Sequence, residues 1–493
     1  MTIDGFLTFV GLVLALLALA SDATRQRLLL HRRSLGLATA VALPAVLYLQ
    51  FFDVLARPCL AQAACGGLIL GGRGRPGADD VAYIVVLAWL VFIAWRLWRR
   101  RLRPRHLPQL SGLLTALAEE RRYSELCRIA GPELDMVADV ASGGIERASA
   151  GEVEAAQAIQ RLMHQREDLV RFIALERPPL AVGMMRRRHT LVFDFADEVL
   201  TVLVSTPGSP LYAEVAANQN TAGPGYHYPE HNTYLHFLLA DATTARDLGA
   251  WQPVMEAVID RLREARASGY AAFLNGPVGR FADVGRWKDQ TFVGIRFLDL
   301  MVSAALVQGI RDHMWLFYTP HVLTPLLDLH DESQPGVNLL DETPTRGGWI
   351  IQQLFSMQLR WIGSVDRLPE VSPHLALEAV RPTSEPANIP KSAILAVKDC
   401  LEQVLVAREV PERFRHMIAD MVFRTLRGLP ATGPRAGFRA ALVATLVEPD
   451  HHSEPYLIGL WAAIDDCDPN LRSGIADLVQ ALQAVYPAPP PRP

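Results

Sequence analysis

Residues 81–105 read VAYIVVLAWLVFIAWRLWRRRLRPR, an apolar stretch that ends abruptly in a series of arginines. From Val81 to Trp98 the only charged side chain is Arg96, in what would be the last helical turn. A helix needs about 17–25 mostly apolar residues to cross the hydrocarbon core of a bilayer. The stretch therefore predicts a transmembrane helix at residues 81–98.

Two further apolar runs precede it, at residues 3–20 and 35–56, and each is interrupted by few charges. The first contains only Asp4, and the second contains Asp53 near its end and Pro44 inside. Three such runs in succession are rare in one soluble domain, so residues 1–106 predict a three-helix membrane anchor. The alternative for the first run is a cleaved signal peptide, but no basic residue precedes the run as a signal peptide requires.

The charge of the chain changes after this segment. Residues 1–106 hold 13 arginines and five aspartates, a net charge of +8, whereas the whole chain carries −4. The arginines cluster at residues 25–33 and 99–105, and cytoplasmic connections of membrane proteins are enriched in such charges. We therefore expect a protein of the inner (plasma) membrane, with its N-terminus outside and the body after residue 106 in the cytoplasm. The lipid bilayer is the first expected partner.

Two of the five cysteines, Cys59 and Cys65, fall in the connection predicted to be external. A disulfide bond between them would suit an oxidising compartment, and the alternative is a pair of small apolar residues at the membrane surface. The three remaining cysteines are expected to be buried thiols of the body.

The body is predicted to be mainly α-helical. Its first segment places Leu110, Leu114 and Leu117 on one helical face, and a long polar helix is expected at 151–175. Proline- and glycine-rich stretches suggest a helical domain at 107–340, a second at 347–486 and a disordered tail at 487–493. Residues 190–204 fit short strands or one helix equally well. The other predicted helices are 229–247, 251–267, 289–312, 347–364, 391–409, 411–428, 435–447, 454–465 and 471–485.

The segment 289–312 is apolar enough to resemble a fourth span. Arg296 and Asp299, three residues apart, share one helix face and could pair. Because carrying both charges through lipid is costly, we expect a core helix of the body.

One short motif carries a metal hypothesis. His227, Glu230 and His231 form H-x-x-E-H, a pattern that in zinc hydrolases supplies two ligands and a base. The geometry needs both histidines on one helix face, and Pro229 inside the motif favours a helix that begins only there. Zinc hydrolysis is therefore kept as an alternative.

The same region concentrates amide and phenol groups that could orient a small polar ligand. They could equally cap helices and satisfy buried backbone groups. The candidate ligand-binding residues are Asn218, Asn220, Tyr226, Tyr228 and Asn232.

Several function classes are disfavoured. The chain has three lysines and no phosphate-binding loop or G-x-S-x-G elbow, and the acidic body argues against nucleic acid. We expect a membrane-anchored interaction or sensor protein that is not an enzyme, needs no cofactor, and binds a protein partner or a second copy. A membrane-permeabilising effector of a bacterial stress or phage-defence system is an alternative by analogy of layout alone.

Overall fold

The computed structural model shows a helical protein, and its described part divides into two compact units. The first unit comprises Met1–Ile173 and Arg186–Thr190, and the second comprises Ala174–Met185 and Leu191–Pro493. The structure describes residues 11, 32–51, 78–98, 102–145, 148–187, 192–219, 226–311, 315–376, 388–448 and 453–487. Within these residues the only β-type pairing is one isolated antiparallel bridge between Pro277 and Thr345.

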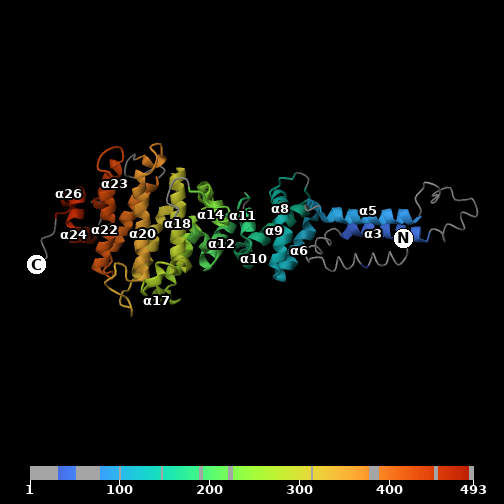
Figure 1. Cartoon of the computed structure of the whole chain (residues 1–493), viewed down its shortest axis with the longest axis horizontal. Helices are drawn as coiled ribbons and strands as arrows, with labels where there is room; N and C mark the ends of the chain where they lie inside the picture. Colours follow the sequence, from blue (N-terminus) through green and yellow to red (C-terminus); the bar gives the residue numbers. More distant parts are fainter. Residues whose placement is uncertain are drawn as a thin grey trace, which may run out of the picture. The chain divides into compact units, whose positions relative to one another are not determined.

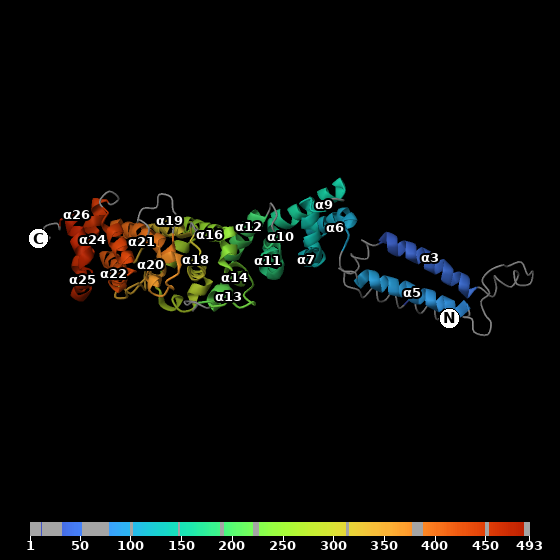
Figure 2. The same cartoon turned by 90° about the horizontal axis from the view of Figure 1, so that it is seen from above.

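Helices α3 (Arg32–Gln50) and α5 (Ala78–Trp98) lie at the second and third predicted spans and pack against each other (Figures 1 and 2). The indole Nε1 of Trp89 donates a hydrogen bond to Thr39 Oγ1 across the pair, at 3.2 Å. The other faces of the helices carry large apolar side chains that the structure leaves exposed. Examples are Leu37, 71% exposed, and Ile84, 57% exposed.

Length and hydropathy single out one described helix that could cross a membrane, and it is α18 (Gln290–Gln308) rather than α3 or α5. The apolar parts of α3 and α5 are shorter, Leu35–Leu49 and Asp80–Ile93. Most of α18 is buried inside the structure, and the core helix of a soluble domain meets the same criteria. The predicted span 3–20 lies outside the described residues except for residue 11. The structure thus shows a mainly helical fold, and it does not show a three-helix anchor.

The rest of the first unit is a group of short helices. Leu110, Leu114 and Leu117 of α6 are buried, as their spacing predicted. The polar helix predicted at 151–175 is broken at Arg166, whose backbone is extended. The helices are α6 (Leu107–Glu119), α7 (Tyr123–Ala130), α8 (Leu134–Ala141), α9 (Ala150–Gln165) and the first part of α10 (Glu167–Glu176).

The second unit is built from successive packed helices. In both views α12, α14, α18, α20, α22 and α24 follow one another through the unit (Figures 1 and 2). Residues 192–205 form helix α12, which decides between the strands and the helix that 190–204 allowed. The helices are α11 (Pro178–Met185), α12 (Val192–Ser205), α13 (Pro210–Ala217), α14 (Thr233–Leu239), α15 (Ala242–Asp247), α16 (Trp251–Arg263), α17 (Tyr270–Leu274), α18, α19 (Tyr318–Asp328), α20 (Arg346–Gly363), α21 (Ile389–Val406), α22 (Glu412–Gly428), α23 (Ala436–Val447), α24 (Glu454–Asp466), α25 (Pro469–Gly474) and α26 (Ala476–Val485).

The predicted boundary between residues 340 and 347 falls inside the second unit. Helix α20, which follows it, packs on α18 and α19 before it and on α21 and α22 after it.

Helix α18 is the centre of the second unit. It contacts α12, α13, α14, α15, α16 and α20, and its close approach to α16 depends on Gly294. The carboxylate of Asp299, 2% exposed, pairs with Arg296, as the sequence predicted, and with Arg360 Nη2 at 2.7 Å. The indole Nε1 of Trp361 also donates to it, at 3.0 Å. The charge is therefore compensated inside the core.

Candidate functional site

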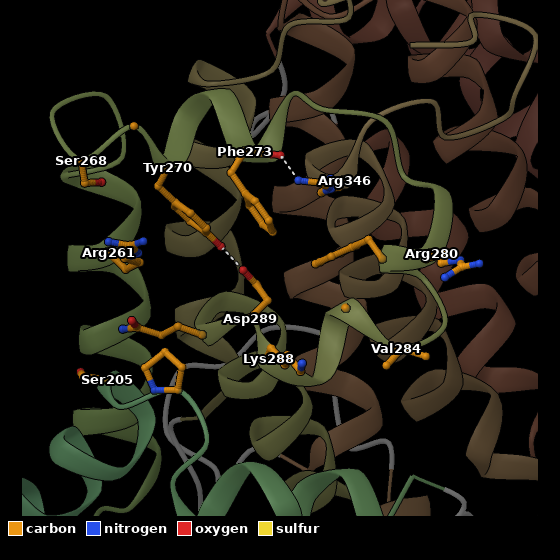
Figure 3. Close-up of a pocket in the computed structure, with 15 residues that line it drawn as sticks. Ser205, Arg261, Ser268, Tyr270, Phe273, Arg280, Val284, Lys288, Asp289 and Arg346 are labelled. Carbon is orange, nitrogen blue, oxygen red and sulfur yellow. Dashed lines mark hydrogen bonds between the residues drawn. The ribbon is translucent and has the colours of Figure 1, made fainter. Parts of the chain in front are cut away.

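A hollow of about 730 Å³ lies within the second unit (Figure 3). Its walls come from the end of α12, from α16 and α17, from residues 280–290, and from the start of α20. Binding sites for small organic ligands enclose about 300–1,000 Å³. The hollow therefore has the size of a site for a small molecule.

Two arginines and two aromatic rings form a stacked ladder along one wall. Figure 3 shows them in the order Arg261, Tyr270, Phe273, Arg346. The guanidinium carbon of Arg261 lies 4.4 Å from the Tyr270 ring centroid, and that of Arg346 lies 4.3 Å from the Phe273 centroid. The two rings are nearly parallel, 14° apart, with centroids separated by 5.6 Å. Cation–π contacts of this kind fix the guanidinium planes while their N–H edges remain available.

A buried hydrogen-bonded group of side chains, centred on Asp289, lies in the middle of the hollow. The hydroxyl of Tyr270 donates to Asp289 Oδ2 at 2.6 Å and lies 2.9 Å from Thr291 Oγ1. Asp289 also accepts from the backbone N–H of Phe292 and so begins helix α18. Burial raises the pKa of Asp289 and raises that of Tyr270 well above its usual range. This carboxyl group thus has a structural role beside any ligand.

The charge of the lining residues is strongly positive. Four cations, Arg261, Arg280, Lys288 and Arg346, face one carboxyl group, that of Asp289. In the part of the chain that the structure describes, none of the four forms an ion pair with a carboxylate. Arg346 Nη1 donates to the backbone carbonyl of Phe273 at 3.2 Å, while its buried Nε has no partner among the described residues. Clustered cations in a cleft attract anions.

Two segments far apart in the sequence are joined to make this wall. Pro277 and Thr345 form the antiparallel bridge, and the backbone N–H of Arg346 donates to the carbonyl of Gly276 at 3.0 Å. The side chain of Thr345 caps helix α20 by accepting from the N–H of Gly348 at 3.0 Å. The bridge therefore brings Arg346 beside the residues that follow α17.

The amide and phenol groups proposed for ligand binding lie elsewhere, at the end of α13 and before α14. Asn218, Asn232 and Tyr228 are buried. The amide of Asn218 donates to the carbonyl of Glu214 at 2.7 Å and accepts from the hydroxyl of Tyr226. Asn220 lies outside the described residues. These contacts are structural, and ligand binding by this group stays a prediction.

The residues of the H-x-x-E-H motif do not lie on a helix. His227 lies in an irregular segment, Glu230 and His231 lie in a turn, and helix α14 begins only at Thr233. All three side chains are exposed. The histidines therefore do not occupy successive turns of one helix, and zinc binding also stays a prediction.

The cysteines divide as the sequence suggested where the structure describes them. Cys127, Cys400 and Cys467 are free and buried, and burial raises the pKa of the Cys400 thiol to about 12. Cys59 and Cys65 lie outside the described residues, so their pairing stays a prediction.

The lining of the hollow was not identified from the sequence. Its cations are separated along the chain and follow no known motif, and residues 276–280 (GPVGR) predict only a turn. One usable signal exists. Lys288 is one of three lysines in an acidic body, and it stands close to one arginine and one tryptophan in GRWKD, residues 285–289.

Comparison with known proteins adds no assignment: family models, curated protein sequences and solved structures all gave no match to this chain.

Proposed function

We propose that this protein is a membrane-anchored receptor whose body binds a small anionic molecule. The single observation that carries the proposal is the hollow, whose lining holds four cations and one buried carboxyl group. Clustered cations without carboxylate partners in a cleft raise the local concentration of anions and so favour anion binding.

A smaller hollow of about 170 Å³ is also lined by arginines, but two of them, Arg296 and Arg360, already pair with Asp299. Two larger hollows differ in charge. One of about 700 Å³ beside α19 and α21 is lined by Asp399 and Glu402 and by no lysine or arginine. Another of about 640 Å³ contains Glu256, Asp260 and Asp328 against one arginine. The cationic hollow is therefore the strongest candidate for an anion.

The test is anion binding by the full chain in lipid nanodiscs. Sulfate, citrate, orthophosphate and inorganic tripolyphosphate are titrated at low and at physiological ionic strength. We expect at least one anion to bind, with weaker binding at the higher ionic strength. Arg280→Gln and Lys288→Gln should reduce affinity, since both side chains are exposed and their loss should leave the fold intact.

Arg263→Gln is the matched control. Arg263 lies on α16 like Arg261, is 71% exposed and pairs with Asp260, but it does not line the hollow. Equal affinities of the wild type and Arg280→Gln for every anion would refute the proposal.

The membrane part of the proposal rests on α3 and α5, whose outer faces expose apolar side chains that lipid would cover. The arginine distribution favours a cytoplasmic body, so a reporter fused at residue 106 should be cytoplasmic and one within residues 66–72 external. A charged residue at the centre of a span costs about 2.5–3.5 kcal/mol. Leu47→Arg combined with Val91→Arg, both at exposed positions near the middle of the predicted spans, should therefore release the chain from the membrane on alkaline extraction, and Leu47→Phe should not. Retention of the double variant would contradict anchoring by these helices.

A further inference from the structure

We infer that the ligand of the cationic hollow carries two or more phosphate groups spaced along one molecule, which bind at opposite ends of the aromatic ladder. The inference rests on the proposed function, and it names the class of anion that the same site takes.

The first observation is the separation of the cations. The rings of Tyr270 and Phe273 stand between Arg261 and Arg346, and the contacts along the ladder are 4.4, 5.6 and 4.3 Å. Figure 3 shows Ser205 and Ser268 on the side of Arg261, and Arg280 on the opposite side. The hollow thus has two ends with hydrogen-bond donors. One phosphate group at either end leaves the cation at the other end unpaired.

The second observation is the carboxyl group between the ends. Asp289 lies below Tyr270 in the middle of the hollow and is hydrogen-bonded to it at 2.6 Å. A single phosphate group placed centrally would be repelled by this group, whereas a chain of phosphate groups carries most of its charge on its terminal groups and can keep them away from it.

The third observation concerns the kind of anion. A guanidinium group binds phosphate through two parallel N–H donors, and the ladder holds both guanidinium planes by stacking. The buried Nε of Arg346 has no partner among the described residues. Phosphate groups carry about −1.5 to −2 charges and three acceptor oxygens each, which matches the net positive charge of the lining.

Spaced phosphate groups occur on soluble polyphosphates and on the headgroups of phosphorylated inositol lipids, and a membrane-anchored body could meet either. The two sources share their chemistry, so the experiment separates them with two arms. In the first arm the full chain in nanodiscs of neutral lipid is titrated with orthophosphate and with inorganic tripolyphosphate. In the second arm the nanodiscs contain a bisphosphorylated inositol lipid, and tripolyphosphate is added as competitor.

In the first arm we expect tripolyphosphate to bind at least about tenfold more tightly than orthophosphate, because charge-assisted bonds form at both ends. Arg261→Gln and Arg280→Gln, one at each end, should each lower the affinity for tripolyphosphate about tenfold. Together they should reduce this affinity to that for orthophosphate. Arg263→Gln should change neither. Melting of each variant by circular dichroism checks the fold, and Arg280→Gln, at an exposed position, decides alone if Arg261→Gln is unstable.

In the second arm, a lipid source is indicated if tripolyphosphate binds less well to nanodiscs with the inositol lipid and Arg280→Gln removes the difference. An unchanged affinity indicates a soluble ligand. Both results support the inference.

Equal affinities for orthophosphate and tripolyphosphate, both lowered by Arg280→Gln, would overturn the two-phosphate ligand and leave the anion receptor standing. Tripolyphosphate binding that none of the variants changes, or no binding of either anion, would overturn the inference. If sulfate and citrate also failed to bind, the proposed function would fall with it.

Discussion

Replacing Asp299 by alanine should cost the second unit about 3 kcal/mol of folding free energy. The carboxylate is 2% exposed and accepts from Arg296, Arg360 and Trp361. Removing one partner of a buried ion pair costs about 3–5 kcal/mol, because the remaining charge stays buried without compensation. The side chain of Arg360 is 55% exposed and can be hydrated again, which places the cost at the lower end of that range.

Two companion variants test this reasoning. Asp299→Asn keeps an acceptor for the indole of Trp361 and should cost less than Asp299→Ala, about 2 kcal/mol. Arg360→Ala removes a half-exposed partner and should cost about 1 kcal/mol or less. Urea denaturation of the full chain in detergent, followed by tryptophan fluorescence, measures all three. The reasoning is refuted if Asp299→Ala stays within about 0.5 kcal/mol of the wild type, or if Arg360→Ala is the more damaging change.

Three further predictions concern helix packing, pH and capping. A Cβ atom at Gly294 would overlap Val258 Cγ2, so Gly294→Ala should lower the free energy of unfolding by about 1–3 kcal/mol. Gly112→Ala, in open space on α6, should raise the free energy of unfolding by about 0.5–1 kcal/mol. Thermal unfolding of the two variants side by side checks both predictions. Burial, with repulsion from neighbouring carboxylates, raises the pKa of Asp197 to about 6. The folded chain then binds more protons than the unfolded chain, so this stabilising contribution is present below about pH 4 and is lost as the pH rises through about 6. Asp197→Asn should therefore match the stability of the wild type at about pH 4 and exceed it at pH 7 by about 1 kcal/mol, a value reduced for solvent screening at this exposed side chain. Unfolding measured across the pH range would contradict this if the stability difference between the two proteins were constant. The buried carboxylate of Glu214 accepts from two backbone N–H groups at the start of α14, at 3.0 and 2.8 Å. Glu214→Ala should therefore lower the free energy of unfolding by about 1–3 kcal/mol and speed hydrogen exchange at those amides. Unchanged exchange would exclude the capping role.

Helices with regular apolar spacing were predictable from the sequence. Leu110, Leu114 and Leu117 lie on one face and are buried in α6, and the pairing of Arg296 with Asp299 follows from their spacing on α18. In these cases the local pattern and the tertiary packing agree, so the sequence alone is enough to predict the element and its contacts.

Breaks that depend on tertiary contacts were not predictable. The polar helix at 151–175 contains no glycine or proline near Arg166, yet it ends there. Asp168, just after the break, pairs with Arg166 and accepts from the hydroxyl of Tyr123 on α7. A contact between residues so far apart in the sequence leaves no mark in local periodicity.

The candidate site escaped prediction for the same reason. Arg261 belongs to a helix of the first predicted domain, whereas Arg346 stands between the two predicted domains, just before the helix expected at 347–364, and each looks like an ordinary surface arginine. Only the stacking of Tyr270 on Phe273 and the bridge at Pro277 make them parts of one wall.

The bridge between Pro277 and Thr345 also determines when the hollow can form during synthesis of the chain. Domains fold during synthesis in order from the N-terminus, and the segment around Pro277 leaves the ribosome well before Thr345 does. Until Arg346 has emerged, the ladder lacks its last member and the hollow lacks a wall. A chain that stops before α20 thus carries most of the residues of the site without their arrangement. Under the proposed function, a bound anion would stabilise finished chains and leave partial ones to proteolysis, so that binding would also select for completed synthesis.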